Sequence, residues 1–422
     1  MRSSLIGCAA LLLAQSVAAQ SAALSRFVGL YMTPTNGPVI VYAATDSMLG
    51  VGFEDGEVRG LKASGNRWVY GAGLGVFAPE QGSMEFVTNA AGVATAVTWA
   101  ANNQTPVTAK RVALREDSVQ FRSGSATLAG SIIMPVETPR SAVVFLHGSD
   151  KETREGSRAF AYAMAARGVA ALIFDKRSTG QSTGTLDGAT FAELAADAAG
   201  AVATLRAHPT LGALPIGLFG PSQGSWIALE TTRQRTDIGF LILQSGDVTT
   251  PLEQEMFRGG ESLRRVRQVP EEDVRELTEY RRMKFMVAIT GQGQTELDRR
   301  TAEVREKSWF RFVGGGLPNR AFWAANGLYD PAPALAAYTG PVLAVFGERD
   351  SYKDVARNAA GMRGALTRAG NPASRVEVMP SSNHGIFVTA TGLPLEREMP
   401  QLSRLAPGYI SLIVDFAAAR RR

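Results

Sequence analysis

Cysteine and histidine are scarce in this chain of 422 residues, which has one cysteine and three histidines. Cys8 lies in an N-terminal segment that we expect to be removed. The mature protein would then lack disulfides, a thiolate nucleophile and any cysteine-based metal site. The histidines are dispersed and no His-Glu-x-x-His motif occurs, so the sequence predicts no metal site and no cofactor.

Apolar runs long enough to cross a bilayer are also lacking, so we expect no membrane span. The N-terminus instead combines Arg2, a short apolar run at 5–14 and small residues at 17–19 before Gln20. This order is typical of a secretory signal peptide. We therefore expect residues 1–19 to be a signal and the protein to be exported, to the periplasm or out of a bacterial cell. Lipid attachment at Cys8 is the less favoured alternative.

Clustered positive charge is absent except at 420–422, although the net charge is +5. Dispersed arginine and lysine form no nucleic-acid footprint. We expect a small-molecule partner, an ester or a peptide, and no nucleic acid. The sequence leaves the oligomeric state open.

Residues 20–115 form the first expected domain. They contain short alternating runs separated by glycine, asparagine and proline, at 27–31, 39–42, 48–53, 68–70, 84–87 and 93–99. Evenly spaced short strands of this kind predict a small antiparallel β-sheet or barrel. A binding role and a structural or lid role for this β domain both stay open.

Residues 116–422 form the second expected domain and have a different pattern of apolar residues. Apolar runs at 142–146, 169–174, 214–219, 240–243 and 342–346 alternate with helical patterns at 158–166, 191–207, 225–233 and 355–369. This alternation predicts an α/β domain with a mostly parallel sheet. Residues 250–335 interrupt it with charged helical sequence, which we interpret as a helical cap insertion. Its apolar side chains would face the active-site cleft or pack on the sheet: Met283, Phe285, Met286, Trp309, Phe310, Phe312 and Trp323.

The pentapeptide Gly-Pro-Ser-Gln-Gly at 220–224 follows an apolar run and precedes a helical one. A strand, a sharp turn and a helix with serine at the apex make a nucleophile elbow, and Gly220 and Gly224 suit its tight turn. Ser222 is thus the candidate nucleophile, and the N–H of Gln223 would point at a developing oxyanion. A second Gly-x-Ser-x-Gly, at 180–184, has no helix after it and is interpreted as a loop.

A nucleophilic serine needs a base, and a histidine base needs a carboxylate to orient it. His384 lies in a loop after a strand-like run, whereas His208 reads as a helix-end residue. Asp350 follows the run at 342–346, and Glu348 is the alternative acid. The order Ser222, Asp350, His384 is that of α/β-hydrolase triads.

The second oxyanion donor should come from the loop after an early strand. His147, Gly148 and Ser149 follow the run at 142–146. Gly148 would let this loop approach the substrate, and the N–H of Ser149 would aim at the oxyanion. We interpret His147 as a structural brace for the loop.

These motifs resemble those of the α/β-hydrolase superfamily, and within it bacterial exported esterases related to the prolyl-oligopeptidase and dienelactone-hydrolase groups. The resemblance covers about residues 118–422 and includes the Asp-Lys-Arg-Ser-Thr-Gly-Gln-Ser stretch at 175–182. It implies that Asp175 and Arg177 stabilise the loop over the site and that Ser182 is not a nucleophile. Two departures are Pro221, where histidine or tyrosine is commoner, and Ser178, where glycine is usual. Residues 27–112 loosely resemble a lipocalin-like β domain.

The expected activity is therefore hydrolysis of carboxylic esters through an acyl-enzyme. The first alternative is a serine peptidase, for which an aminopeptidase would need a cap carboxylate such as Glu253, Glu255 or Glu261 to hold the substrate amine. A thioesterase or a carbohydrate acyl esterase is a further alternative. A non-catalytic binding protein on the same fold is the candidate from another class.

Overall fold

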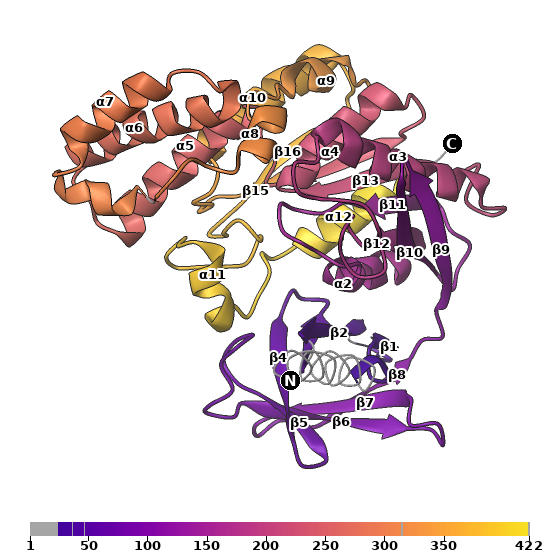
Figure 1. The fold of residues 1–422 in the computed structure, drawn as a ribbon. Helices are drawn as coiled ribbons and strands as arrows, with labels where there is room; N and C mark the ends of the chain where they lie inside the picture. The colour runs from indigo at the N-terminus through magenta and orange to yellow at the C-terminus, as the bar shows by residue number, and fades with distance from the viewer. Residues whose placement is uncertain (1–23, 36, 46, 314, 421–422) are drawn as a thin grey trace, which may run out of the picture.

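The computed structural model describes residues 24–420 except 36, 46 and 314. The expected signal peptide and Cys8 lie outside the described residues. The chain first forms a β-barrel and then a larger α/β unit (Figure 1). In the part of the chain that the structure describes, no helix is long and apolar enough to cross a membrane.

The barrel is closed and antiparallel, with each strand paired to the next and β1 paired to β8 through Tyr31 and Arg111. Its strands are β1 (Gly29–Met32), β2 (Pro38–Thr45), β3 (Met48–Phe53), β4 (Val58–Ser64), β5 (Arg67–Tyr70), β6 (Gly82–Thr88), β7 (Ala94–Ala101) and β8 (Val107–Arg111). The small antiparallel β domain is confirmed. Six strands match the predicted runs, whereas β4 and β8 carry too many polar residues to stand out.

The α/β unit is built on an eight-stranded sheet in the order β16-β15-β14-β13-β11-β12-β10-β9. The strands are β9 (Arg115–Ser123), β10 (Ala126–Met134), β11 (Ser141–Phe145), β12 (Val169–Phe174), β13 (Ile216–Pro221), β14 (Phe240–Gln244), β15 (Val342–Gly347) and β16 (Arg375–Met379). Strands β11 to β16 run parallel, and β9 and β10 are antiparallel. The central strands are buried on both faces, which explains their continuous apolar sequence.

Helices cover both faces of this sheet, as predicted for an α/β-hydrolase fold. One face packs against α2 (Glu155–Ala165) and α12 (Tyr409–Ala418). The other packs against α3 (Phe191–Ala207), α4 (Gln223–Gln234) and α10 (Val355–Ala369). A capping box of Thr190 and Glu193 starts α3 at the predicted residue.

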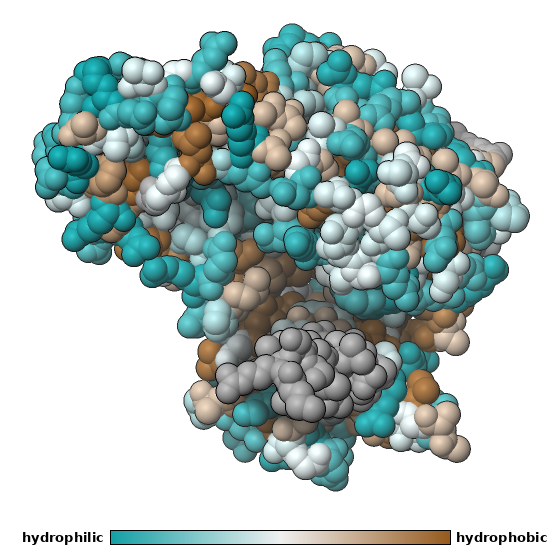
Figure 2. Space-filling view, viewed as in Figure 1, coloured by the Kyte–Doolittle hydropathy of each residue, from teal (hydrophilic) through white to brown (hydrophobic). Residues whose placement is uncertain are grey.

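An insertion separates β14 from β15 and projects to one side of the sheet (Figure 1). It contains α5 (Pro251–Glu261), a π-helix (Ser262–Val266), α6 (Glu271–Thr290), α7 (Gln294–Val304), a 3-10 helix (Ser308–Phe312), α8 (Arg320–Asn326) and α9 (Ala332–Ala337). Its outer surface is mostly hydrophilic (Figure 2). The seven apolar residues expected to face the cleft or the sheet pack in two clusters inside the insertion. None of the seven belongs to the clusters that cover the sheet, so packing on the sheet was the wrong alternative, and facing the cleft stays a prediction.

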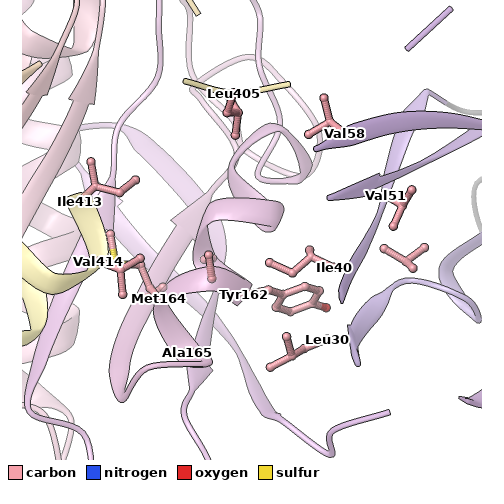
Figure 3. Packing of buried hydrophobic residues seen from close by; sticks show 14 of the residues in the cluster. Leu30, Ile40, Val51, Val58, Tyr162, Met164, Ala165, Leu405, Ile413 and Val414 are labelled. Carbon is pink, nitrogen blue, oxygen red and sulfur yellow. The ribbon is translucent and has the colours of Figure 1, made fainter. Parts of the chain in front are cut away.

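The barrel and the α/β unit share one hydrophobic cluster (Figure 3). Tyr162, on α2, lies beside Leu30 of β1 and Ile40 of β2. Val58 of β4 lies near Leu405, from the C-terminal part of the chain. A continuous core of this kind indicates that the barrel is a fixed part of the molecule rather than a tethered module.

Candidate active site

Ser222 sits in a sharp turn between β13 and α4, with φ of +51° and ψ of −115°. A non-glycine residue with positive φ is strained, and such strain is characteristic of a nucleophile elbow. The flanking glycines leave no room for side chains. A Cβ on Gly220 would lie 2.4 Å from the Gly224 carbonyl oxygen, and one on Gly224 would lie 2.8 Å from that of His147.

Asp350 and His384 form a hydrogen-bonded pair, with 2.7 Å between Asp350 Oδ2 and His384 Nδ1. The Asp350 side chain is fully buried, and its other oxygen accepts a hydrogen bond from the Tyr352 backbone N–H at 2.8 Å. A carboxylate can only accept, so Nδ1 carries the hydrogen. This tautomer leaves the lone pair on His384 Nε2, where a base needs it.

The end of β14 connects the serine and the histidine. The Ser222 backbone N–H donates to the Gln244 carbonyl at 2.8 Å, and the hydroxyl of the next residue, Ser245, donates to the His384 carbonyl at 2.9 Å. Ser222, Asp350 and His384 thus all follow the carboxyl ends of parallel strands, β13, β15 and β16. This is the sheet edge where α/β folds place their chemistry.

Glu348, the alternative acid, is engaged elsewhere, because its carboxylate accepts a hydrogen bond from the Ser381 backbone N–H at 2.8 Å. Glu348 therefore braces the loop before His384 and does not orient the imidazole.

Tyr352 is a neighbour of the histidine that sequence reasoning missed. Its ring centroid lies 4.7 Å from that of His384, and its hydroxyl contacts the Glu396 carboxylate. Burial, with Glu396 adding to it, raises the pKa of Tyr352, so the phenol stays neutral. No sequence pattern near Tyr352 identifies this contact, which depends on the distant segment around residue 396.

Two backbone amides are the candidate donors to an oxyanion. Gln223 N–H is the first amide of α4, and Ser149 lies in the loop after β11, against which Gly224 packs. Among the described residues neither amide has a protein acceptor, whereas the Gly148 N–H donates to Glu152 Oε1 at 3.1 Å. An oxyanion hole requires donors that have no protein acceptor of their own.

Lys176 was also missed, and it connects both sides of this region. Its Nζ donates to the Gly148 carbonyl at 2.6 Å and the Asp150 carbonyl at 3.0 Å, and lies 3.5 Å from Gln223 Oε1. Burial lowers the pKa of Lys176 to about 8, although the Glu152 and Asp150 carboxylates act in the opposite direction. Its place directly after β12 is the signal that could have indicated it.

His147 braces the same loop. Its Nε2 lies 2.7 Å from the Phe174 carbonyl, which can only accept, so Nε2 carries the hydrogen. Burial lowers the pKa of His147 to about 4. The ring is neutral near pH 7 and is tied to the backbone, away from any role as the base.

The residues that the resemblance implied to be supporting are engaged in ion pairs. Asp175 accepts from Arg154 Nη2 at 2.7 Å and from the Gln181 N–H at 2.9 Å, and Arg177 pairs with Asp197 of α3 through two bonds of 2.7 Å. These contacts fasten the 175–182 loop to its surroundings.

Three further residues have structural contacts outside the candidate triad. The Ser182 hydroxyl donates to the Asp175 carbonyl at 2.7 Å and accepts from the Ala129 N–H at 3.0 Å, so it is not free for chemistry. Ser178 has φ of +65°, which explains why glycine suits that position. His208 ends α3 and accepts from the Thr210 N–H at 3.2 Å.

A buried ion pair lies just behind the site. Asp247, three residues beyond the end of β14, pairs with Lys353 and accepts from Asn358 Nδ2 at 3.0 Å. Both side chains are almost fully buried. The pair ties the end of β14 to the loop that follows Asp350. Within the described ranges, no group of three or more histidine, cysteine or acidic side chains could hold a metal ion.

Comparison with known proteins identifies the family. A family model described as serine aminopeptidase, S33 matches residues 137–389, which is more than half of the chain. A putative phosphoribosyl transferase of Mycobacterium tuberculosis is 32% identical over 117 residues. That match covers 28% of this chain and 26% of the relative, so the relative's activity does not carry over.

The chain is also similar to solved structures of low sequence identity. A dienelactone hydrolase of Anabaena variabilis is 16% identical, with 73% of this chain and 96% of that chain covered and a TM-score of 0.41. An esterase of Pyrococcus furiosus is 15% identical, with 73% of this chain and 92% of that chain covered and a TM-score of 0.46. An esterase of Exiguobacterium antarcticum is 16% identical, with 71% of this chain and 99% of that chain covered and a TM-score of 0.43. The extent of the family match shows that this chain belongs to the serine aminopeptidase S33 family, and its strand order is that of the α/β-hydrolase fold.

Proposed function

We propose that this protein is an exported serine esterase. Ser222 Oγ attacks the ester carbonyl carbon while His384 Nε2 takes its proton, and the Gln223 and Ser149 amides hold the oxyanion. The intermediate collapses, and the alcohol leaves with the proton from His384. Water then attacks the acyl-enzyme with His384 again as base, which releases the acid and restores Ser222.

The observation that supports this proposal most is the Asp350–His384 pair at the rim that also carries the elbow serine. A buried carboxylate bonded to Nδ1 has no use in packing alone, since apolar side chains of similar volume are often as stable or more so. Its value is to hold one tautomer with Nε2 free to accept a proton.

The cap favours esters over peptides with a free amino terminus. An aminopeptidase needs an unpaired carboxylate for the substrate ammonium. Each candidate is already paired with arginine: Glu253 with Arg282 at 2.6 Å, Glu255 with Arg281 at 2.8 Å and Glu261 with Arg265 at 2.6 Å. An incoming ammonium would have to displace a bound guanidinium.

Steady-state kinetics on p-nitrophenyl esters of graded chain length, beside aminoacyl-p-nitroanilides, test the proposal. We expect ester turnover that exceeds anilide turnover, and a Ser222→Ala variant that loses both turnover and labelling by a fluorophosphonate. An acyl thioester and an acetylated sugar complete the panel, because either could be the preferred acyl donor. Anilide turnover above ester turnover would assign the family's aminopeptidase activity instead.

Full ester turnover by Ser222→Ala would overturn the mechanism, and absence of labelling in the wild type would indicate a protein without catalysis. For export, N-terminal sequencing of the protein from the native host should find a mature chain that begins at Gln20.

A further inference from the structure

Residues 402–406, here called the strap, lie between the barrel and the catalytic histidine loop. On the barrel side, Leu405 N–H donates to the Gly56 carbonyl, and Val58 N–H donates to the Ser403 carbonyl, each at 2.8 Å. The pairing is an antiparallel bridge between Glu57 and Arg404. The strap thus extends the edge of the β3–β4 hairpin.

The other edge of the strap pairs with the residues that follow His384. Ala406 N–H donates to the Ile386 carbonyl and Val388 N–H donates to the Arg404 carbonyl, each at 2.8 Å, with a bridge between Phe387 and Leu405. One ladder of backbone hydrogen bonds therefore runs from the barrel, through the strap, to the segment that begins two residues after His384.

That segment is strained. Ile386 is fully buried and has φ of +62°, a conformation that a β-branched residue rarely adopts. Such strain persists only where the surroundings hold it. Here the Ile386 carbonyl is held by the strap, and the Asn383 side chain accepts from the Gly385 and Phe387 amides at 3.1 Å.

A second contact joins the barrel to Pro400 and to the first residue of the strap, Leu402. Gly75 N–H donates to the carbonyl of Pro400, in the 3-10 helix Met399–Gln401, and Leu74 N–H donates to the Leu402 carbonyl, at 2.8 and 2.9 Å. The preceding helix α11 (Leu395–Glu398) ends at Glu398, whose carboxylate accepts from Asn383 Nδ2 at 3.0 Å. The barrel thus reaches the histidine loop by two routes.

We propose that the N-terminal barrel is a positioning module for the proposed catalytic base, and that it sets the place of His384 through the strap. The inference rests on the proposed function, because it gives His384 a catalytic task. In this role the barrel affects turnover through the position of His384, without contacting the substrate. Disturbing the contact should therefore lower kcat and leave KM nearly unchanged.

Gly73→Ala is the test, with Gly52→Ala as its matched control. A Cβ on Gly73 would lie 2.5 Å from the Pro400 carbonyl oxygen, so the strap region must shift. A Cβ on Gly52, in the same barrel, would meet only Val58 Cγ1 at 3.8 Å. We expect Gly73→Ala to lower kcat on a p-nitrophenyl ester by about tenfold to a hundredfold, the cost of a small misplacement of a catalytic group.

Hydrogen exchange gives the second readout, in which the Val388 and Ala406 amides should exchange faster in Gly73→Ala than in Gly52→Ala. A folded Gly73→Ala protein with faster exchange and wild-type kcat would overturn the inference. If Gly73→Ala does not fold, Arg404→Ala is the alternative test of the inference. This substitution removes the 2.9 Å ion pair between the strap and Asp55 and introduces no clash. That variant should lower kcat, and unchanged kcat would likewise overturn the inference.

The result is separable from a failure of the proposed function. If Ser222→Ala kept turnover, the mechanism itself would be wrong. If Ser222→Ala were inactive while the barrel and strap variants kept wild-type kcat, only the role of the barrel would be lost.

Discussion

At the scale of single residues, two acidic side chains that lie two positions apart have different roles. Asp350 is buried and faces His384 Nδ1, whereas Glu348 accepts from the backbone before that histidine. The difference follows from the turn after β15, which directs Asp350 inward and Glu348 toward the 381 loop. Sequence reasoning ranked Asp350 first on its position alone, and the geometry supplies the physical reason.

Asp350→Asn should lower kcat on esters by about 10³–10⁴-fold with little change in KM. An amide facing Nδ1 favours the tautomer with hydrogen on Nε2, which cannot accept the serine proton. Glu348→Gln is the control, because its amide oxygen can still accept from Ser381 and kcat should stay near that of the wild type. Similar losses in both variants would contradict the assignment.

His147 predicts how stability depends on pH. Its pKa is about 4 in the folded protein, below its ordinary value of 6.5, because burial disfavours the imidazolium. Between these values the unfolded chain binds a proton that the folded chain does not, so the free energy of unfolding falls as pH decreases from about 6.5 to 4. Urea unfolding at pH 7 and pH 4.5 should show a loss of about 2–3 kcal/mol from this residue.

His147→Gln keeps a donor for the Phe174 carbonyl but does not titrate. Its free energy of unfolding should therefore depend less on pH across the same window. Equal pH dependence in the wild type and in His147→Gln would show that other groups cause the acid loss.

At the scale of elements, the elbow is a tight turn with no room for added atoms at its two glycines. Gly220→Ala would put a Cβ 2.4 Å from the Gly224 carbonyl oxygen, so β13 and α4 would have to separate. We expect a loss of about 1–3 kcal/mol in stability. Because Ser222 and the Gln223 amide move with this turn, ester turnover should fall as well.

The matched change is Gly364→Ala in α10, where the new Cβ would meet only Arg368 Nη1 at 3.4 Å. Alanine favours the helix over glycine, so this variant should gain about 0.5–1 kcal/mol. Calorimetry of the two proteins tests both signs. A stabilised Gly220→Ala protein would contradict the clash.

Helices and strands with strong local signals were predictable. The bounds predicted for α3 and α10 coincide with the observed ones, because each has an amphipathic pattern and a polar cap, Thr190 or Asp354. Strand β9 was not predicted, since this edge strand is mostly exposed and polar. The pairing of the strap was not predicted either, because isolated β-bridges produce no periodic pattern in the sequence.

The residues of the candidate site also divide into those that a sequence motif indicates and those that it does not. The triad and the two oxyanion amides belong to residues at strand ends, which a motif and its spacing indicate. Lys176 and Tyr352 owe their places to partners far along the chain, and no local pattern encodes such pairs. Packing of the cap's apolar residues on the sheet was the wrong alternative, because an apolar sequence pattern does not specify which surface covers it.

At the scale of the whole molecule, the barrel and the α/β unit should unfold together. Leu30 of β1 is 2% exposed and belongs to the cluster that includes Tyr162 of α2. Leu30→Ala should cost about 2–5 kcal/mol, because it leaves a cavity in that shared core. Calorimetry should show one transition at lower temperature, with activity lost in the same range. A separate early transition of the barrel, with activity intact, would contradict a common core.

The position of the strap near the carboxyl end also has a consequence for biogenesis. The β3–β4 hairpin is synthesised long before its partner, the strap, which emerges from the ribosome after Ser222, Asp350 and His384. An incomplete chain can contain all three triad residues and still lack the piece that holds the histidine loop. Such a chain should therefore turn over esters poorly until the strap has been synthesised.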